Sequence, residues 1–243
     1  MDVYWLEQTE ADVPAGNQWL SAREMLCFAG MRFAKRRTDW RLGRWTAKRA
    51  LAAHLNLPTD LSALANIEIR AAPSGAPEVH LLNQTTQVTI SLSHSAGTAI
   101  CAVARSGTDL GCDLELVESR SHAFLADYFT ATEQALVEQA CAEERPLLVT
   151  LLWSAKESAL KALHEGLRLD TRCMDVSLVD TAPAREQRRR DSCPVSLLDP
   201  TSNSWSPLRV RYANTRLFRG WWRQSDHMVR TIISESRCTA CGG

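Results

Sequence analysis

The chain has 243 residues, 45% of them hydrophobic, and its 28 Lys and Arg residues balance 28 Asp and Glu residues. A chain of this length forms one large or two small domains and can bury a core without disulfides or structural metals. The balanced charge argues against a dedicated nucleic-acid-binding protein. Its apolar runs fall short of the ~18 residues of a membrane span, and the acidic start does not resemble a secretory signal. We therefore expect a cytoplasmic protein that contacts no membrane.

Eight cysteines are scattered along the chain. This scatter, without an export signal, indicates reduced thiols rather than a disulfide framework. The one tight pair, Cys238-x-x-Cys241, lacks the second pair of ligands that a structural zinc site needs, so we interpret it as ordinary thiols of the C-terminal tail.

The first part of the sequence favours helices followed by strands. The segment Ser21-Ala-Arg-Glu24 has the spacing of a capping box and predicts a helix over residues 21–32. Thr38 or Asp39 could cap a second helix over residues 40–55. Alternating apolar and polar residues then predict strands at 88–93, 99–104 and 110–117.

The second part repeats this order. Pro146 suits the beginning of a helix and Gly166 its end, which predicts a helix over residues 147–164. Strand-like segments follow. Helices and then strands, twice over, predict an α+β protein of two comparable halves, although no repeat of identical residues is visible. We expect the halves to span residues 1–107 and 108–243, with the later strands at 174–179, 208–212 and 228–233.

Two carboxylates fall close together in Gly111-Cys-Asp-Leu-Glu115. Side chains alternate along a strand, so Asp113 and Glu115 share one face, where their charges repel. Magnesium relieves such repulsion, since it takes one or two protein carboxylates and completes its shell with water and phosphate oxygens. A solvent-facing acidic strand is the alternative interpretation.

A second pair of charged residues lies on the predicted helix over residues 147–164. Glu157 and Lys161 are four residues apart and therefore share a helix face. They could form an ordinary surface ion pair. Alternatively, Glu157 binds a metal or accepts a proton, and Lys161 binds a phosphate.

The stretch from Arg32 to Arg49 contains eight basic residues and one acid, Asp39. Arg binds phosphate through two parallel hydrogen bonds, so this stretch suggests an anionic ligand. Trp40 and Trp45 interleave with the basic residues, so single-stranded nucleic acid is an alternative ligand. A solvated helix face without a ligand is a further interpretation. His94, at the end of a predicted strand, could bind phosphate or be structural.

Taken together, these motifs resemble the surfactin-synthetase-activating family of 4′-phosphopantetheinyl transferases over residues 20–165. The family usually has a basic residue where this chain has Ala76. The matching segments are Lys35-Arg-Arg-Thr-Asp-Trp-Arg-Leu-Gly-Arg44, Gly75-Ala-Pro77, Ser91-Leu-Ser-His94, Gly111-Cys-Asp-Leu-Glu115, and Trp153-Ser-Ala-Lys-Glu157 with Lys161.

The resemblance implies an enzyme that transfers 4′-phosphopantetheine from coenzyme A to a serine of an apo acyl or peptidyl carrier protein. It implies two similar halves related by a pseudo-two-fold axis, in an active monomer, with coenzyme A between them. It also implies Mg²⁺, replaceable by Mn²⁺, on Asp113, Glu115 and Glu157, with Glu157 and Lys161 as catalytic residues. The implied coenzyme A contacts are Arg36, Arg44, Ser74, Gly75, Ser93, His94, Asp113, Lys156, Glu157 and Lys161.

Two alternatives from other classes stay open. One is a non-catalytic regulator that binds coenzyme A without turnover. The other is a nucleic-acid-binding module that uses the basic helix together with the run Arg188-Arg-Arg190.

Overall fold

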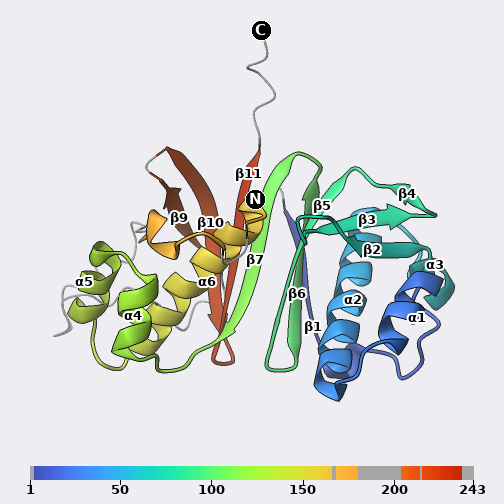
Figure 1. The fold of residues 1–243 in the computed structure, drawn as a ribbon, viewed down its shortest axis with the longest axis horizontal. Coiled ribbons are helices and arrows are strands. Elements are labelled where there is room, and N and C mark those ends of the chain that lie inside the picture. The colour runs from blue at the N-terminus through green and yellow to red at the C-terminus, as the bar shows by residue number, and fades with distance from the viewer. Residues whose placement is uncertain (1–2, 166–167, 180–203, 214, 237–243) are drawn as a thin grey trace, which may run out of the picture.

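A computed structural model describes residues 3–165, 168–179, 204–213 and 215–236. The fold is mixed α/β, and each half carries one long helix packed on a sheet, with the strands of the two halves meeting in the middle (Figure 1). Among the described residues, no helix is long and apolar enough to cross a membrane.

The first half contains two antiparallel sheets, one of order β1-β6-β5 and a smaller one of order β2-β3-β4. Helix α2 packs against β1, β5 and β6. In chain order its elements are β1 (Tyr4–Thr9), α1 (Ala22–Ala29), α2 (Ala34–His54), α3 (Leu61–Ala65), β2 (Ile67–Ala71), β3 (Pro77–Leu81), β4 (Gln84–Thr85), β5 (Val88–Ser95) and β6 (Thr98–Arg105).

In the described part of the second half, the strands form one antiparallel sheet of order β7-β11-β10-β9-β8, which helix α6 covers. Strand β11 returns from the end of the described chain to pair with β7, which places it at the centre of the molecule (Figure 1). The elements are β7 (Thr108–Leu116), α4 (His122–Tyr128), α5 (Ala131–Gln139), α6 (Arg145–Leu163), β8 (Met174–Leu178), β9 (Ser206–Tyr212), β10 (Arg216–Ser225) and β11 (Met228–Ser236).

Strand β6 is buried on both faces, which explains its nearly unbroken run of apolar residues. Alternate side chains point to opposite faces of a strand. Cys101 and Val103 therefore join the core beneath α2, whereas Ile100, Ala102 and Ala104 join a separate core shared with β7 and β11. This shared core joins the two halves.

A buried ion pair also ties the ends of the described chain together. The guanidinium of Arg230 on β11 donates two hydrogen bonds of 2.6 Å to the carboxylate of Glu7 on β1. Arg230 is only 3% exposed, so its charge is stabilised by this carboxylate rather than by water. Its guanidinium also donates to the backbone carbonyls of Ser225 and Met228.

The predicted helix boundaries hold only in part, since the helix predicted over residues 21–32 ends at Ala29 and the one predicted over 147–164 begins at Arg145. The capping box of Ser21 and Glu24 is confirmed. Helix α2, in contrast, begins at Ala34, so the predicted cap at Thr38 or Asp39 is wrong. Asp39 instead forms an ion pair of 2.7 Å with Lys35, one turn earlier on the same helix. This pair stabilises the helix across the predicted boundary.

The expectation of reduced thiols holds for part of the described chain only. Cys27, Cys101, Cys112 and Cys173 are free, whereas Cys141 is disulfide-bonded. The predicted tail pair Cys238 and Cys241, and the basic run at 188–190, lie outside the described residues.

Lys48 on α2 is fully buried and connects several elements of the first half. Its ammonium donates to the carbonyl oxygens of Trp19 and Leu64 and lies 2.6 Å from the carboxylate of Glu24. Glu24 also accepts the backbone N–H of Ile69, so one buried ion pair connects α1, α2 and β2.

Candidate functional site

The site is built where α6 crosses β7. A side chain at Gly111 would collide with the carbonyl oxygen of Ser158, so only glycine allows this close approach. Hydrogen bonds to the neighbouring strand also hold the helix, since the hydroxyls of Ser154 and Ser158 lie 2.9 and 2.7 Å from that of Thr231 on β11. The close contact brings the charged face of α6 against the carboxylates of β7.

Asp113 is the centre of this arrangement, and it is only 4% exposed. Its Oδ1 accepts hydrogen bonds of 2.8 Å from the hydroxyl of Ser93 on β5 and from the ammonium of Lys161 on α6. Its Oδ2 is buried without a hydrogen-bond partner. A buried carboxylate oxygen in this state is costly, and a cation or a donor from a ligand would satisfy it.

Glu115 lies two residues further along β7. The indole N–H of Trp153 donates to its Oε1 at 3.1 Å, and the guanidinium of Arg120 lies 3.7 Å from Oε2. Burial raises the pKa of Glu115, and the charge of Asp113 adds to this effect.

Glu157 faces the same space from α6. Burial, followed by the negative charge of Asp113, raises the pKa of the Glu157 carboxyl to about 7, although Lys161 opposes the shift. Burial disfavours the charge on Lys161, but Asp113, Cys112 and Glu157 outweigh it, so the pKa of this ammonium is raised. The structure thus brings together Ser93, Asp113, Glu115, Glu157 and Lys161.

The chemistry of this donor set fits a divalent cation. The charge of Asp113 raises the pKa of Glu115 and of Glu157, and one oxygen of Asp113 lacks a hydrogen-bond partner, so added positive charge would stabilise the three carboxylates. Oxygen ligands are also those that magnesium prefers. The carboxylates do not stand as a closed cage, however, since no group of three or more His, Cys, Asp or Glu side chains in the described residues is placed to hold a metal.

A hollow of about 400 Å³ lies beside this cluster. Four predicted coenzyme A contacts line it: Arg44, Ser74, Gly75 and Lys161. Arg44 has its guanidinium over the ring of Trp40 at 4.9 Å and 3.7 Å from Glu24, and its Nε is buried without a hydrogen-bond partner. Ala76 also lines the hollow, so no side-chain charge enters from that position.

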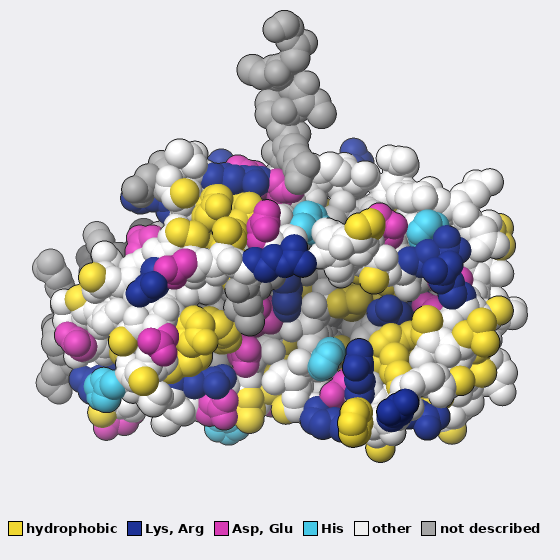
Figure 2. Space-filling model, viewed as in Figure 1, with side chains coloured by type: hydrophobic (Ala, Val, Ile, Leu, Met, Phe, Trp, Pro, Cys, Tyr) yellow, Lys and Arg dark blue, Asp and Glu magenta, His cyan; other side chains and the backbone are white. Residues whose placement is uncertain are grey.

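A second hollow, of about 390 Å³, is lined by the predicted contacts Arg36 and His94 together with Phe33, Lys35 and Trp40. Figure 2 shows basic side chains gathered at the lower right, over the beginning of α2. Apart from Ser93, which lines neither hollow, the predicted coenzyme A contacts of the first half therefore lie along two hollows rather than in one.

Lys156 does not join the site. Its ammonium is fully buried, lies 2.7 Å from the carboxylate of Glu133 on α5, and donates to the carbonyl oxygens of Tyr128, Thr171 and Met174. Reaching coenzyme A would leave Glu133 charged and unpaired in the core. This placement contradicts the predicted contact, and we assign Lys156 a structural role instead.

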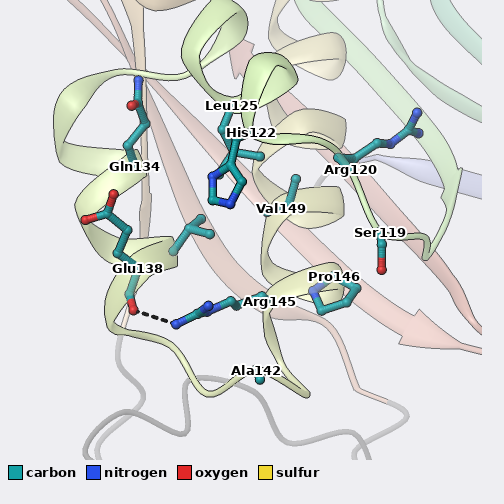
Figure 3. A pocket seen from close by; sticks show the side chains of 11 residues that line it. Ser119, Arg120, His122, Leu125, Gln134, Glu138, Ala142, Arg145, Pro146 and Val149 are labelled. Atoms are coloured by element: carbon teal, nitrogen blue, oxygen red, sulfur yellow. Dashed lines mark hydrogen bonds between the residues drawn. The ribbon is translucent and has the colours of Figure 1, made fainter.

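Another hollow, of about 290 Å³, lies between α4, α5 and the beginning of α6 and contains none of the predicted site residues (Figure 3). Its Arg145 is already engaged, because it donates to the backbone carbonyls of Glu138 and Ala140. Arg120 lies on its rim and also approaches Glu115, so this hollow borders the carboxylate cluster.

Sequence reasoning assigned no role to Trp153 or Arg120, the two neighbours of Glu115. Trp153 precedes Glu157 by four residues and so lies on the same side of α6. This spacing and the place of Trp153 in the segment Trp153-Ser-Ala-Lys-Glu157 are the available signals, and neither reveals which strand residue the indole meets.

A sequence model of the 4′-phosphopantetheinyl transferase superfamily (ACPS) matches residues 109–213. The matched stretch begins on β7 and contains Asp113, Glu115, Glu157 and Lys161. This part of the chain is therefore similar to the 4′-phosphopantetheinyl transferase superfamily. No curated protein matches the chain.

Three solved structures resemble parts of the chain. Helicobacter pylori holo-(acyl-carrier-protein) synthase in complex with coenzyme A is 20% identical, with a TM-score of 0.34, over 43% of this chain and 99% of that one. The Bacillus anthracis synthase with coenzyme A (3′,5′-ADP) is 21% identical, with a TM-score of 0.36, over 43% and 96%. The Thermotoga maritima synthase is 20% identical, with a TM-score of 0.32, over 51% and 72%. These scores are too low to establish a shared fold for the whole chain.

Proposed function

We propose that the chain is a 4′-phosphopantetheinyl transferase of the surfactin-synthetase-activating type, which modifies a serine of an apo acyl or peptidyl carrier protein. The observation that carries this proposal is the convergence of Asp113, Glu115, Glu157 and Lys161, all within the stretch that matches the superfamily. This set combines a proton acceptor, Glu157, with the ammonium of Lys161, beside a hollow of about 400 Å³.

The reaction moves phosphopantetheine as one group. The serine oxygen attacks the β-phosphorus of coenzyme A, a new P–O bond forms, and the bond to the bridging oxygen of 3′,5′-ADP breaks. The electron pair of that bond leaves with 3′,5′-ADP. The serine proton needs an acceptor in the protein.

Glu157 is that acceptor in our proposal, directly or through a water. Burial, followed by the charge of Asp113, brings the pKa of Glu157 to about 7 in the metal-free chain, which favours proton acceptance near neutral pH, and a bound cation would lower that pKa. Lys161 faces the leaving pyrophosphate oxygens with an ammonium that Asp113 holds in place. Such fixed charges stabilise the charge that develops during phosphoryl transfer.

The cation in this proposal is Mg²⁺, which Mn²⁺ can replace, and Asp113, Glu115 and Glu157 would hold it. When bound, it supplies positive charge that neutralises the pyrophosphate. Support comes from the unpartnered Oδ2 of Asp113 and from the mutual repulsion of the carboxylates.

The two hollows take the remainder of coenzyme A. We assign the adenosine 3′-phosphate and pyrophosphate to the basic side chains that line them and to the end of β5. Positive charge comes there from Arg36, Arg44 and Lys35, although Ala76 stands where the family usually has a basic residue. The proposed coenzyme A contacts are Arg36, Arg44, Ser74, Gly75, Ser93, His94, Asp113, Glu157 and Lys161.

We also propose that the halves, residues 1–107 and 108–243, are related by a pseudo-two-fold axis and work as a monomer in the cytoplasm. Matching ion pairs in the two halves, Lys48 with Glu24 and Lys156 with Glu133, support the relation. Both sides of the site come from one chain, so no second copy is needed to complete it.

The direct test is to mix the protein with apo carrier proteins, coenzyme A and Mg²⁺ and to measure carrier mass. We expect a gain equal to phosphopantetheine that disappears with Glu157→Gln. Coenzyme A binding without any mass gain across acyl and peptidyl carriers would favour the non-catalytic regulator. Nucleic-acid binding at micromolar strength with a steep salt dependence would favour the binding module.

A further inference from the structure

Trp153 lies between helix α4 and the carboxylates of β7. Its ring meets those of Phe124 and Tyr128 edge to face, with centroids 5.1 Å away in both cases. These contacts fix the plane of the indole, and its N–H then points at Oε1 of Glu115, 3.1 Å away.

The two strand carboxylates are held in the same manner. On Asp113, Ser93 and Lys161 engage Oδ1, while Oδ2 is buried without a hydrogen bond. On Glu115, Trp153 engages Oε1, while Oε2 faces Arg120 at 3.7 Å, beyond hydrogen-bond distance. Each carboxylate is thus fixed by hydrogen bonds through one oxygen, whereas its other oxygen accepts none, and Oε2 of Glu115 has only the ion pair with Arg120.

The first half provides an internal comparison. Trp45 stands three residues before the buried Lys48, as Trp153 stands three residues before the buried Lys156. The ring of Trp45 also packs edge to face, against Trp19 at 5.2 Å, but its Nε1 is buried without a hydrogen-bond partner. Packing therefore accounts for an aromatic ring at both places, and only Trp153 meets a carboxylate through its N–H.

We propose that Trp153 is a positioning residue, which holds Glu115 through Oε1 so that Oε2 is presented, beside Oδ2 of Asp113, to the divalent cation. This rests on the proposed function, since it concerns the same site. Groups that orient a metal ligand in this way typically change metal affinity by about 10- to 100-fold when removed.

Trp153→Phe keeps an aromatic ring against Phe124 and Tyr128 but removes the N–H. We expect about tenfold weaker Mn²⁺ binding, measured by electron paramagnetic resonance on the full chain with coenzyme A present. The half-saturating Mg²⁺ concentration for transfer should rise in parallel, while the KM for coenzyme A at saturating Mg²⁺ stays unchanged. The matched control is Trp45→Phe, which loses no hydrogen bond and should bind Mn²⁺ like the wild type.

A mutant cycle separates positioning from general damage. If Trp153 acts through Glu115, Trp153→Phe should have no further effect on Mn²⁺ affinity in a Glu115→Gln background. A second measurement needs no variant at position 153: the ¹⁵N-labelled indole signal of Trp153 should shift when Mg²⁺ and coenzyme A are added, and that of Trp45 should not.

Unchanged Mn²⁺ affinity in a folded Trp153→Phe protein would overturn the proposal, as would equal losses in both tryptophan variants or an indole signal indifferent to Mg²⁺. A wild-type chain that binds no Mn²⁺ would overturn it as well. A wild-type chain that binds Mn²⁺ through Glu115 but modifies no carrier would instead contradict the proposed function and leave the role of Trp153 intact.

Discussion

Lys48 and Lys156 occupy equivalent environments in the two halves of the molecule. Each is fully buried, each pairs with a glutamate that closes a capping box, and each donates to backbone carbonyls of its own half. The glutamates match as well, because Glu24 accepts the N–H of Ile69 and Glu133 that of Val176. The two lysines are therefore core elements that anchor each long helix.

Removing either lysine should destabilise the fold. Lys48→Met and Lys156→Met each remove the nearest cation of a buried glutamate, a change that typically costs ~3–5 kcal/mol. Urea unfolding measures this loss, and the coenzyme A affinity of the folded Lys156→Met protein should match the wild type. A stable Lys156→Met protein with weakened coenzyme A binding would restore the contact that the sequence predicted.

Asp113→Ala should abolish transfer while the protein stays folded. The substitution removes the acceptor of Ser93 and Lys161 and the carboxylate oxygen that lacks a partner. We expect turnover to fall by at least ~100-fold, since the residue both orients Lys161 and contributes to the proposed cation site. Turnover and circular dichroism are measured together. Near-normal turnover at limiting Mg²⁺ would remove Asp113 from the metal site.

The raised pKa of Glu157 predicts a pH-dependent stability in the metal-free protein. Its pKa is about 7 in the folded chain, above the usual 4.5, so the folded state binds the proton more tightly. This contribution to stability is fully present below pH ~4.5 and is lost as the pH rises through about 7. After discounting for partial exposure, we expect ~2 kcal/mol.

Glu157→Gln removes this titration. In EDTA, its stability relative to the wild type should rise by that amount between pH 5 and pH 8, as measured by urea unfolding. Glu143→Gln, at an exposed acid, serves as the control and should show no such trend. Parallel pH profiles for the wild type and Glu157→Gln would show that Glu157 titrates in its ordinary range.

Arg44→Ala tests the assignment of the basic helix to coenzyme A. A charge-assisted hydrogen bond contributes roughly 1.5–3 kcal/mol, so the KM for coenzyme A should rise by about 10- to 150-fold. Dephospho-coenzyme A lacks the 3′-phosphate. Its KM should therefore be nearly the same for Arg44→Ala as for the wild type. Equal losses with both donors would place Arg44 on the pyrophosphate or, through Glu24, in folding. No loss with either would make the stretch from Arg32 to Arg49 a solvated face.

Gly111→Ala should separate α6 from β7. The added methyl group collides with the carbonyl oxygen of Ser158, which is backbone and cannot rotate away. We expect a lower melting temperature and, in the folded fraction, loss of transfer with coenzyme A binding less affected. Gly43→Ala on α2 is the matched control, because open space surrounds that position. Equal effects of the two substitutions would show that the close approach is not what the site requires.

The sequence by itself determined the local features that depend on near neighbours along the chain. The capping box at Ser21, the strand that carries Asp113 and Glu115 on one face, and the helix that carries Glu157 and Lys161 on another all follow from fixed periods of backbone structure. Short or weakly patterned elements, such as β2, β3 and α4, depend on tertiary packing and were not predicted.

Only the tertiary structure decided which lysine of α6 lies at the carboxylate cluster. Lys156 and Lys161 are five residues apart and therefore point about 140° away from each other around the helix. Nothing local shows which direction faces the core, because that depends on where Glu133 and β7 lie after folding. The structure buries Lys156 against Glu133 and places Lys161 on Asp113, since Gly111 lets α6 approach β7 from that one side.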